Sequence, residues 1–277
     1  MITCHLMGGL GNQLFQIFAT ISTAIDYKQE YMFEESKDDK DSHGFARPTY
    51  WDTLMANLTP VLVGHKLHFA IAKYMQFNYN KIMLDTKIDT KLFGYFQSYK
   101  YFEDNYKEIY TILDINNIKK SIADKYAFTP KTTITCSLHF RIGDYKSIQA
   151  YHNILKPQYY LDAIRKLIFE LETDNFNVLV FNEECDNENI SKIINVFSSS
   201  FTNIKFIRIP YEIPDWEQMM IMSLCNHNIT ANSSFSWWGA YLNNNEKKIV
   251  IRPAQWFGPN LRNNDVNDLC PSHWIKI

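Results

Sequence analysis

Three short polar stretches follow apolar, strand-like parts of this chain, and their side chains suit a phosphorylated sugar. They are residues 8–13, 139–145 and 233–238. In α/β proteins, ligands bind outside the carboxyl ends of parallel strands. The strand-like run 133–140 leads into this middle stretch, which holds a histidine, an arginine and an aspartate within six residues, 139–144. It is therefore the strongest candidate for chemistry.

His139, Arg141 and Asp144 are the candidates in the middle stretch. Side chains alternate along a strand, so His139 and Arg141 are expected on the same side. The planar guanidinium of Arg141 can donate two hydrogen bonds to a pyrophosphate and neutralise the charge that grows as it leaves. Asp144 is the first candidate for a general base. A buried histidine beside a surface Arg141–Asp144 ion pair is the alternative explanation.

The first stretch resembles the dinucleotide fingerprint G-x-G-x-x-G, but Leu14 stands in place of the third glycine. That substitution disfavours an NAD-dependent enzyme, and a glycine turn that packs a strand on its helix explains Gly9 and Gly11 equally well. Packing does not explain Asn12 and Gln13. Two amides at the start of a helix, beside free backbone N–H groups, favour an anion or a sugar hydroxyl.

The third stretch offers the hydroxyls of Ser233 and Ser234 at the start of a helix. Serine is also an ordinary helix N-cap, which stays an alternative. Two consecutive serines in a second strand-helix unit nevertheless repeat the arrangement expected of a nucleotide site. Trp237 and Trp238 are expected to pack in the core.

Composition excludes several classes of protein. With 277 residues and 46% hydrophobic content the chain can form one large or two small domains, and its 28 basic and 30 acidic residues indicate neither a nucleic-acid nor an anionic membrane partner. Residues 2–25 lack charge, but Asn12, Gln13 and Gln16 argue against a membrane anchor or signal peptide. We expect a cytoplasmic enzyme, peripheral to a membrane at most. The cysteines are expected to be reduced core thiols: Cys4, Cys136, Cys185, Cys225 and Cys270.

Metal and hydrolase chemistry find no support in the motifs. The chain has no G-x-S-x-G elbow, P-loop, H-E-x-x-H motif or cysteine and histidine cluster at metal spacing. Its D-x-D triplet, Asp39-Lys40-Asp41, falls in the charged segment 36–41, so we interpret it as solvated. His65 and His68 are expected to be structural or exposed.

Hydrophobic patterning predicts an α/β fold. The amino-terminal part is expected to contain a strand at 2–6, a helix at 13–27 and a strand at 31–34, with 53–120 mostly helical around a turn at 92–95. From residue 132, strands and helices alternate, which implies a parallel sheet covered by helices on both faces. Strands are expected at 133–140, 177–181, 204–209, 227–231 and 248–251, and helices at 157–171, 187–197, 215–225 and 235–242.

Taken together in this order, the three stretches resemble the α-1,2-fucosyltransferase family, glycosyltransferase family eleven. Further matching segments are 94–98, 158–160, 224–227 and 273–274. The resemblance spans the chain. It implies a GT-B-like α/β fold of two Rossmann-like domains facing a cleft. The expected domains are an acceptor-side domain at 1–128 and a nucleotide-sugar-binding domain at 129–277.

The resemblance also implies a reaction. The donor would be GDP-β-L-fucose, with no metal required, and the sugar would be transferred with inversion to a hydroxyl, the 2-hydroxyl of a terminal galactoside. The acceptor would be a galactose-containing oligosaccharide or a lipid-linked glycan. The variable regions 36–50 and 51–79 are expected to build its pocket.

By the same resemblance, Arg141 would hold the donor pyrophosphate, and His139 with Asp144 would shape the nucleotide and reaction site. Asn12 would approach the sugar or acceptor from the amino-terminal domain. Further donor contacts would come from Gly11, Asn182, Glu183, Ser233, Ser234 and Phe235. Two departures from the family pattern concern charge: Ile142 replaces a second arginine, so that Arg141 acts alone or with Lys146, and Glu183-Glu184 replace a pair of aspartates.

Three functions stay open on the sequence. The first is the α-1,2-fucosyltransferase. The second is a transferase of other linkage or of another nucleotide sugar. The third is a non-catalytic glycan- or nucleotide-binding protein of the same fold.

Overall fold

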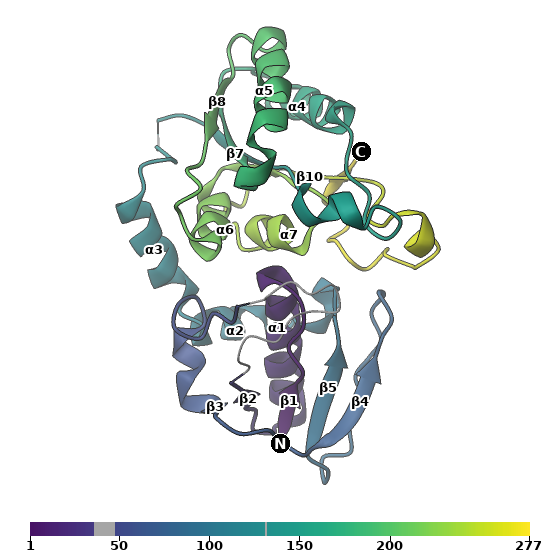
Figure 1. The fold of residues 1–277 in the computed structure, drawn as a ribbon. Helices are drawn as coiled ribbons and strands as arrows, with labels where there is room; N and C mark the ends of the chain where they lie inside the picture. The colour runs from purple at the N-terminus through teal and green to yellow at the C-terminus, as the bar shows by residue number, and fades with distance from the viewer. Residues whose placement is uncertain (36–47, 131) are drawn as a thin grey trace. The chain divides into compact units, whose positions relative to one another are not determined.

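The chain forms two compact units. The computed structural model describes residues 1–35, 48–130 and 132–277 (Figure 1). The first unit is Met1–Ile118 with Asn264–Pro271, and the second is Lys119–Asn263 with Ser272–Ile277. The units divide within helix α3, Ile115–Lys125, whereas the domains 1–128 and 129–277 stay a prediction. The predicted loop 36–41, with Asp39-Lys40-Asp41, lies outside the described residues.

A small parallel sheet and a buried helix organise the first unit. Its strands pair in the order β1-β5-β4, and β2 pairs with β3, all in parallel. The bounds are β1 Ile2–Cys4, α1 Leu10–Tyr27, β2 Phe33–Glu34, η1 Ala56–Val61, β3 Leu62–Val63, β4 Ala70–Tyr74, β5 Thr90–Gly94, η2 Tyr99–Tyr101 and α2 Tyr106–Ile112.

The prediction of a mostly helical region at 53–120 with a turn at 92–95 is wrong. Strand β5 runs through that turn and is the middle strand of its sheet. The strand was missed because it contains a lysine, which is rarely buried. Lys91 is nevertheless buried, and its ammonium pairs with Glu34 at 2.6 Å. Gly94 is required by close packing, since a Cβ there would lie 2.0 Å from the carbonyl oxygen of Tyr74 on β4.

Helix α1 explains why the first 25 residues lack charge. It begins at Leu10, three residues before the prediction, and is buried on nearly every side. Gly8 has φ +74°, a conformation that favours glycine and turns the chain into the helix. The hydroxyls of Thr20 and Thr23 donate to the carbonyls one turn earlier, so burial leaves them satisfied. In the described parts of the chain, no helix is long and apolar enough to cross a membrane.

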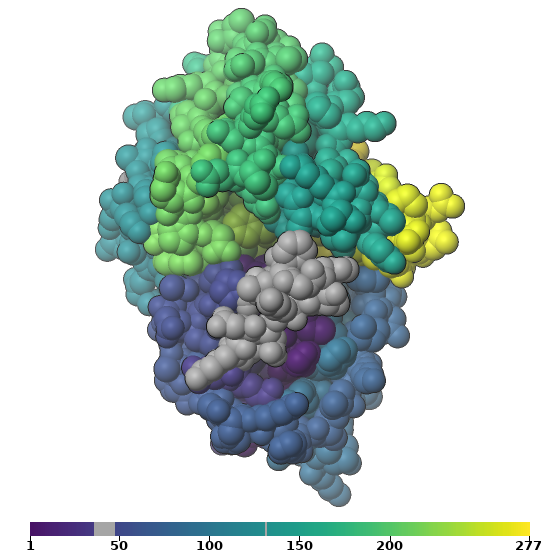
Figure 2. Space-filling view, in the orientation of Figure 1, coloured from purple at the N-terminus to yellow at the C-terminus, as the bar shows by residue number. Residues whose placement is uncertain are grey.

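The second unit is built on a six-stranded parallel sheet with helices packed against it (Figure 1). Figure 2 shows one face of this unit in space-filling form, in teal and green. Most of its elements agree with the predicted ones to within three residues; β11 was not predicted. The bounds are β6 Thr135–His139, η3 Gly143–Ser147, α4 Pro157–Leu171, β7 Asn177–Phe181, η4 Glu184–Asp186, α5 Asn187–Ser200, β8 Lys205–Arg208, α6 Asp215–Leu224, β9 His227–Ile229, α7 Ser234–Tyr241, β10 Val250–Arg252, η5 Pro259–Leu261 and β11 Ile275–Lys276.

The order of these strands reverses once. It is β11-β10-β9-β6-β7-β8, so the chain builds outward from β6 on one side and then returns to build outward from β9 on the other. This is the 3-2-1-4-5-6 order of a dinucleotide-binding fold, and its crevice lies where the order reverses. Here the reversal lies between β6 and β9.

Strand β6 has two different faces. Cys136, Leu138 and Phe140 are buried in a cluster with residues of α4, β7 and α5. The alternate residue Ser137 accepts a hydrogen bond from Asn228 on β9, and His139 contacts Phe235 on α7. Side chains therefore alternate along 136–140, and His139 lies on the α7 side of the sheet; that Arg141 shares this side stays a prediction. Four of the cysteines are buried as predicted, but Cys185 is exposed, because it lies in the turn after β7.

Two lysines, the buried Lys119 and the half-buried Lys248, donate to carbonyls at the carboxyl end of α7. Lys248 donates from Nζ to the carbonyls of Ala240 at 2.9 Å and Asn243 at 2.6 Å, and Lys119 donates to Leu242 at 2.8 Å. The last carbonyls of a helix have no partner within it, and cations are favoured there. The two ammonium groups therefore stabilise the end of the helix that begins with the candidate serines.

Replacing Lys248 with methionine is expected to lower the free energy of unfolding by about 1–3 kcal/mol, because carbonyls at the end of α7 lose their donor. Urea denaturation followed by circular dichroism would measure the change. Lys247→Met is the matched control, since Lys247 is adjacent and exposed. Equal stability of the two variants would contradict the capping role.

Candidate functional site

Most of the predicted site residues meet at one edge of the second sheet. The strands β6, β7 and β9 are neighbours, and the polar residues follow their carboxyl ends. Residues brought to this edge are His139, Arg141, Asp144, Asn182, Glu183, Ser233, Ser234 and Phe235. Gly11 and Asn12 belong to the first turn of α1, in the first unit.

Arg141 is held by two carboxylates. Its Nη2 lies 2.7 Å from Oδ1 of Asp144, and its Nη1 pairs with Oε1 of Glu183. The guanidinium also lies over the ring of Tyr145, 5.3 Å from its centroid. The predicted ion pair with Asp144 is thus present, but it is not a surface pair, because the two side chains are only 20% and 12% exposed. Charge pairing and the ring below it fix the guanidinium in a defined position.

His139 is buried and uncharged at neutral pH. Burial, and secondly the nearby Arg141, lower its pKa from 6.5 to about 3. Its ring lies 5.4 Å from that of Phe235, and its Nδ1 has no hydrogen-bond partner among the residues that the structure describes. A neutral imidazole carries one donor and one acceptor. His139 can therefore hydrogen-bond a ligand without adding charge to the site.

Asn182 and Glu183 differ in exposure and in partners. Asn182 is buried, and its Nδ2 donates to the hydroxyl of Tyr211 at 3.2 Å, whereas its Oδ1 has no hydrogen-bond partner in the described part of the chain. The Glu183 side chain is 43% exposed and extends to Arg141. Gly143 leaves space for this carboxylate, since a Cβ there would lie 1.9 Å from Oε2 of Glu183. Glu183 is the more exposed of the two carboxylates on Arg141.

The serine stretch forms the start of α7. Ser233 is its N-cap, and its hydroxyl accepts from the N–H of Phe235 at 3.3 Å, so the capping explanation is confirmed for this serine. Ser236 accepts from the N–H of Ala231 through its hydroxyl at 3.1 Å. Ser234 is half-buried. As predicted, Trp237 and Trp238 are fully buried.

The two amides of the first stretch have different surroundings. Gln13 is buried, and its Nε2 donates to the carbonyls of Gly8 and Pro48. These bonds hold the chain around the helix start, while the buried Oε1 of Gln13 accepts no hydrogen bond from the residues that the structure describes. Asn12 is half-buried and accepts from Nε2 of Gln97 at 2.8 Å.

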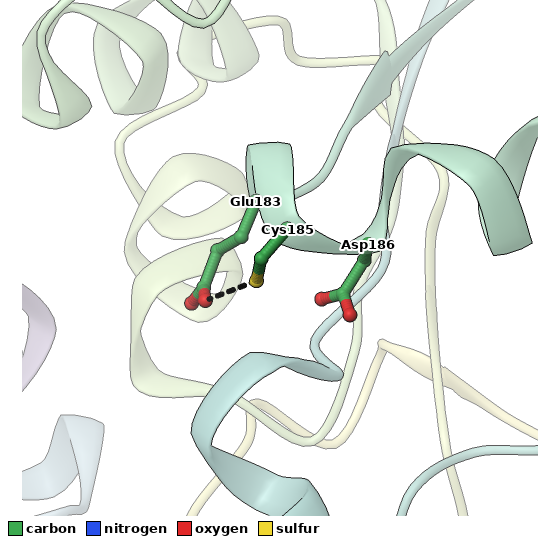
Figure 3. A group of neighbouring side chains, drawn as sticks. All are labelled: Glu183, Cys185 and Asp186. Carbon is green, nitrogen blue, oxygen red and sulfur yellow. Dashed lines mark hydrogen bonds between the residues drawn. The ribbon is translucent and has the colours of Figure 1, made fainter.

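An acidic turn follows β7. Figure 3 shows Glu183, Cys185 and Asp186 leaving this turn, and one ligand atom from each lies within 4.8 Å of the others. Such a group could in principle hold a cation. However, Glu183 already pairs with Arg141, and Asp186 pairs with Lys146 at 2.5 Å. The cations of the chain itself balance these carboxylates.

Sequence reasoning missed two residues that shape the site. Tyr145 lies under Arg141, and its hydroxyl donates to the carbonyl of Asn232 at 3.0 Å. Asp186 accepts from the N–H of Gly143 at 2.7 Å. Tyr145 was part of the recognised stretch, but nothing in the spacing indicated a ring below the arginine. Asp186 lies five residues after the end of β7, beyond the part of the loop that the motif covers.

Comparison with known proteins identifies the family of this chain. The model of the family described as Glycosyl transferase family 11 matches residues 1–277. The chain belongs to this family. It is therefore a glycosyltransferase, as the resemblance implied.

Two relatives from Escherichia coli are each 30% identical to this chain over the matched residues. An alpha-1,2-colitosyltransferase matches over 300 residues, covering 100% of this chain and 99% of the relative. The O-antigen biosynthesis glycosyltransferase WbnK matches over 215 residues, covering 74% of this chain and 66% of the relative.

A solved structure shares the fold. It is a mutant of Arabidopsis thaliana FUT1 in complex with GDP, with a TM-score of 0.50 and 11% identity, covering 98% of this chain and 74% of that one. The predicted GT-B-like fold class is confirmed: the α/β units with parallel sheets resemble those of GT-B glycosyltransferases.

Because His139 is neutral in the folded protein, the free energy of unfolding is expected to depend on pH. The pKa of His139 is lower in the folded state than in the unfolded state. The neutral side chain therefore makes its full contribution to stability above pH 6.5, and this contribution is lost as the pH falls towards 3. His139→Gln is expected to reduce the slope of unfolding free energy against pH, between pH 6.5 and 4, by up to about 1.4 kcal/mol per pH unit. Denaturant titrations at several pH values would measure the slope. The exposed His68→Gln should leave the slope unchanged, and an unchanged slope in His139→Gln would contradict the assignment.

Proposed function

We propose that this protein is an inverting glycosyltransferase that moves L-fucose from GDP-β-L-fucose to the 2-hydroxyl of a terminal galactoside. The observation that carries the proposal is the reversal of strand order between β6 and β9. Arg141 follows one of these strands and the start of α7 follows the other. A diphosphate bound at this crevice would meet a cation and helix N–H groups together.

The chemistry would be a single displacement. The acceptor hydroxyl attacks the anomeric carbon, the bond from that carbon to the β-phosphate oxygen breaks, and GDP leaves with the bonding electrons. The hydroxyl proton passes to a base. Arg141 and the N–H groups at the start of α7 would stabilise the charge on the leaving diphosphate, which is greatest in the transition state.

The other residues would act around this step. Asp144, predicted as the base, contacts Arg141, and this contact supports an orienting role for the same carboxylate. Ser233, Ser234 and Phe235 would line the diphosphate, His139 and Asn182 would contact the nucleotide, and Gly11 and Asn12 would contribute from the first unit. We propose that no metal takes part, since Arg141 supplies the positive charge.

The comparisons support this donor and linkage at a coarser level. One relative is named for α-1,2 transfer of colitose, and the plant protein of similar fold was solved with GDP. Colitose is L-fucose without its 3-hydroxyl, so GDP-colitose is the second candidate donor. The acceptor in either case would be a galactose-containing oligosaccharide or lipid-linked glycan.

Incubation with GDP-fucose or GDP-colitose, each with lactose and without it, tests the proposal. GDP release and NMR of the product would give the donor and the linkage. We expect lactose-dependent release with GDP-fucose and a product linked at the galactose 2-hydroxyl. If lactose-dependent turnover occurs with GDP-colitose and not with GDP-fucose, GDP-colitose is the donor. If the protein binds either compound but turns over neither, it is a non-catalytic protein.

Arg141→Ala is expected to lower kcat/KM about 100-fold or more, because the leaving diphosphate loses its cation. Initial rates at varied GDP-fucose would measure the loss. Arg165→Ala is the control, since Arg165 is an exposed arginine on α4 that contacts Asp162. A rate close to that of the wild type, with the fold intact, would contradict the assignment of Arg141.

Glu183→Gln is expected to tighten GDP binding by about three- to fivefold, since the carboxylate occupies the guanidinium that the diphosphate needs. Isothermal titration calorimetry with GDP would measure the change. The adjacent, exposed Glu184→Gln should bind as the wild type does. Weaker binding by Glu183→Gln would instead indicate that Glu183 contacts the donor directly.

A further inference from the structure

Asp186 is placed where it would ordinarily cap its own helix, but it does not do so. It is the N-cap residue of α5, and aspartate at this position usually accepts from the backbone N–H groups of the first turn. Its side chain makes no such bond. The carboxylate instead contacts the loop after β6, and it is only 1% exposed. The Asp186 side chain therefore contacts another loop and does not cap α5.

Both oxygens of Asp186 are engaged by that loop. Oδ2 accepts from the N–H of Gly143 at 2.7 Å, and Oδ1 accepts from Nζ of Lys146 at 2.5 Å. These two residues lie near the opposite ends of η3. A turn of five residues has little stability of its own, so contacts from outside decide its position. The ammonium of Lys146 neutralises the buried carboxylate of Asp186, and this contact holds it at Asp186.

The turn that Asp186 holds carries the partners of Arg141. Asp144 contacts the guanidinium at 2.7 Å, and the ring of Tyr145 lies below it. Tyr145 is tied in turn to the carbonyl of Asn232, in the loop after β9. The turn therefore spans from the β7 loop to the β9 loop, with Arg141 against it.

We propose that Asp186 is a positioning residue that holds η3, and through it Arg141, in the orientation that binds the diphosphate of a nucleoside diphosphate sugar. This inference rests on the proposed function, since it assumes that Arg141 binds that diphosphate. Asp186 itself touches no ligand, because both of its oxygens are satisfied within the protein.

A double-mutant cycle with Arg141 tests the inference. Calorimetry would give the affinities of the intact protein for GDP and for guanosine, which lacks the diphosphate. Asp186→Ala is expected to weaken GDP binding about tenfold and to change guanosine binding less than twofold. In the Arg141→Ala background the same substitution is expected to change GDP binding less than twofold, because the group that Asp186 positions is gone.

Two results would overturn the inference while the proposed function stands. One is an equal loss of GDP affinity in both backgrounds, and the other is an equal loss of GDP and guanosine affinity. A wild-type protein that does not bind GDP would instead refute the proposed function, and the inference with it.

Control variants separate positioning from general stability. Glu188→Gln removes an exposed carboxylate from the first turn of α5, which pairs with Lys192, and should bind GDP as the wild type does. If Asp186→Ala does not fold, Asp186→Asn replaces it in the cycle, since the amide keeps the shape and an acceptor for Gly143. We expect Asp186→Asn to weaken GDP binding about threefold in the Arg141 background and not in the Arg141→Ala background. Equal losses in the two would overturn the inference.

Discussion

The reversal of strand order between β6 and β9 is the constraint on which the site depends. Because all six strands are parallel, their carboxyl ends share one edge of the sheet. Because the chain returns to the far side of β6 after β8, the loops after β6 and β9 have no strand between them. A crevice at this edge follows from the connections of the strands.

The charged side chains at this edge form ion pairs with one another, and there is no excess of cations among those described. Arg141 contacts two carboxylates, and Lys146 contacts a third, Asp186. An anionic ligand must therefore compete for the arginine, and the exposure of Glu183 makes it the carboxylate that can move. His139 fits the same scheme, because burial beside Arg141 keeps it neutral. The affinity of such a site depends on which carboxylates stay in place when the ligand arrives.

Prediction from the sequence succeeded where the signal was local. Helix α4 and strand β7 have the predicted bounds, because a proline at the helix start and an unbroken apolar run are visible within a few residues. It failed at β5, whose buried Lys91 depends on Glu34 from a distant strand. It also did not show that Gln13 binds the carbonyl of Pro48, because Pro48 lies far along the chain.

The sequence by itself determined the alternation of strands and helices and the polar stretches at the strand ends. These follow from periodicity and from residue types at fixed spacing, which are local properties. The family was indicated by the resemblance of its motifs, and the match of the family model to residues 1–277 shows it. Only the tertiary structure decided the strand order, the pairing of Arg141 with Glu183, and the diversion of Asp186 from its own helix to η3. Each of these is a contact between residues distant in the chain. Such contacts depend on which surfaces pack together and on which buried charges must be paired, and no local pattern specifies either.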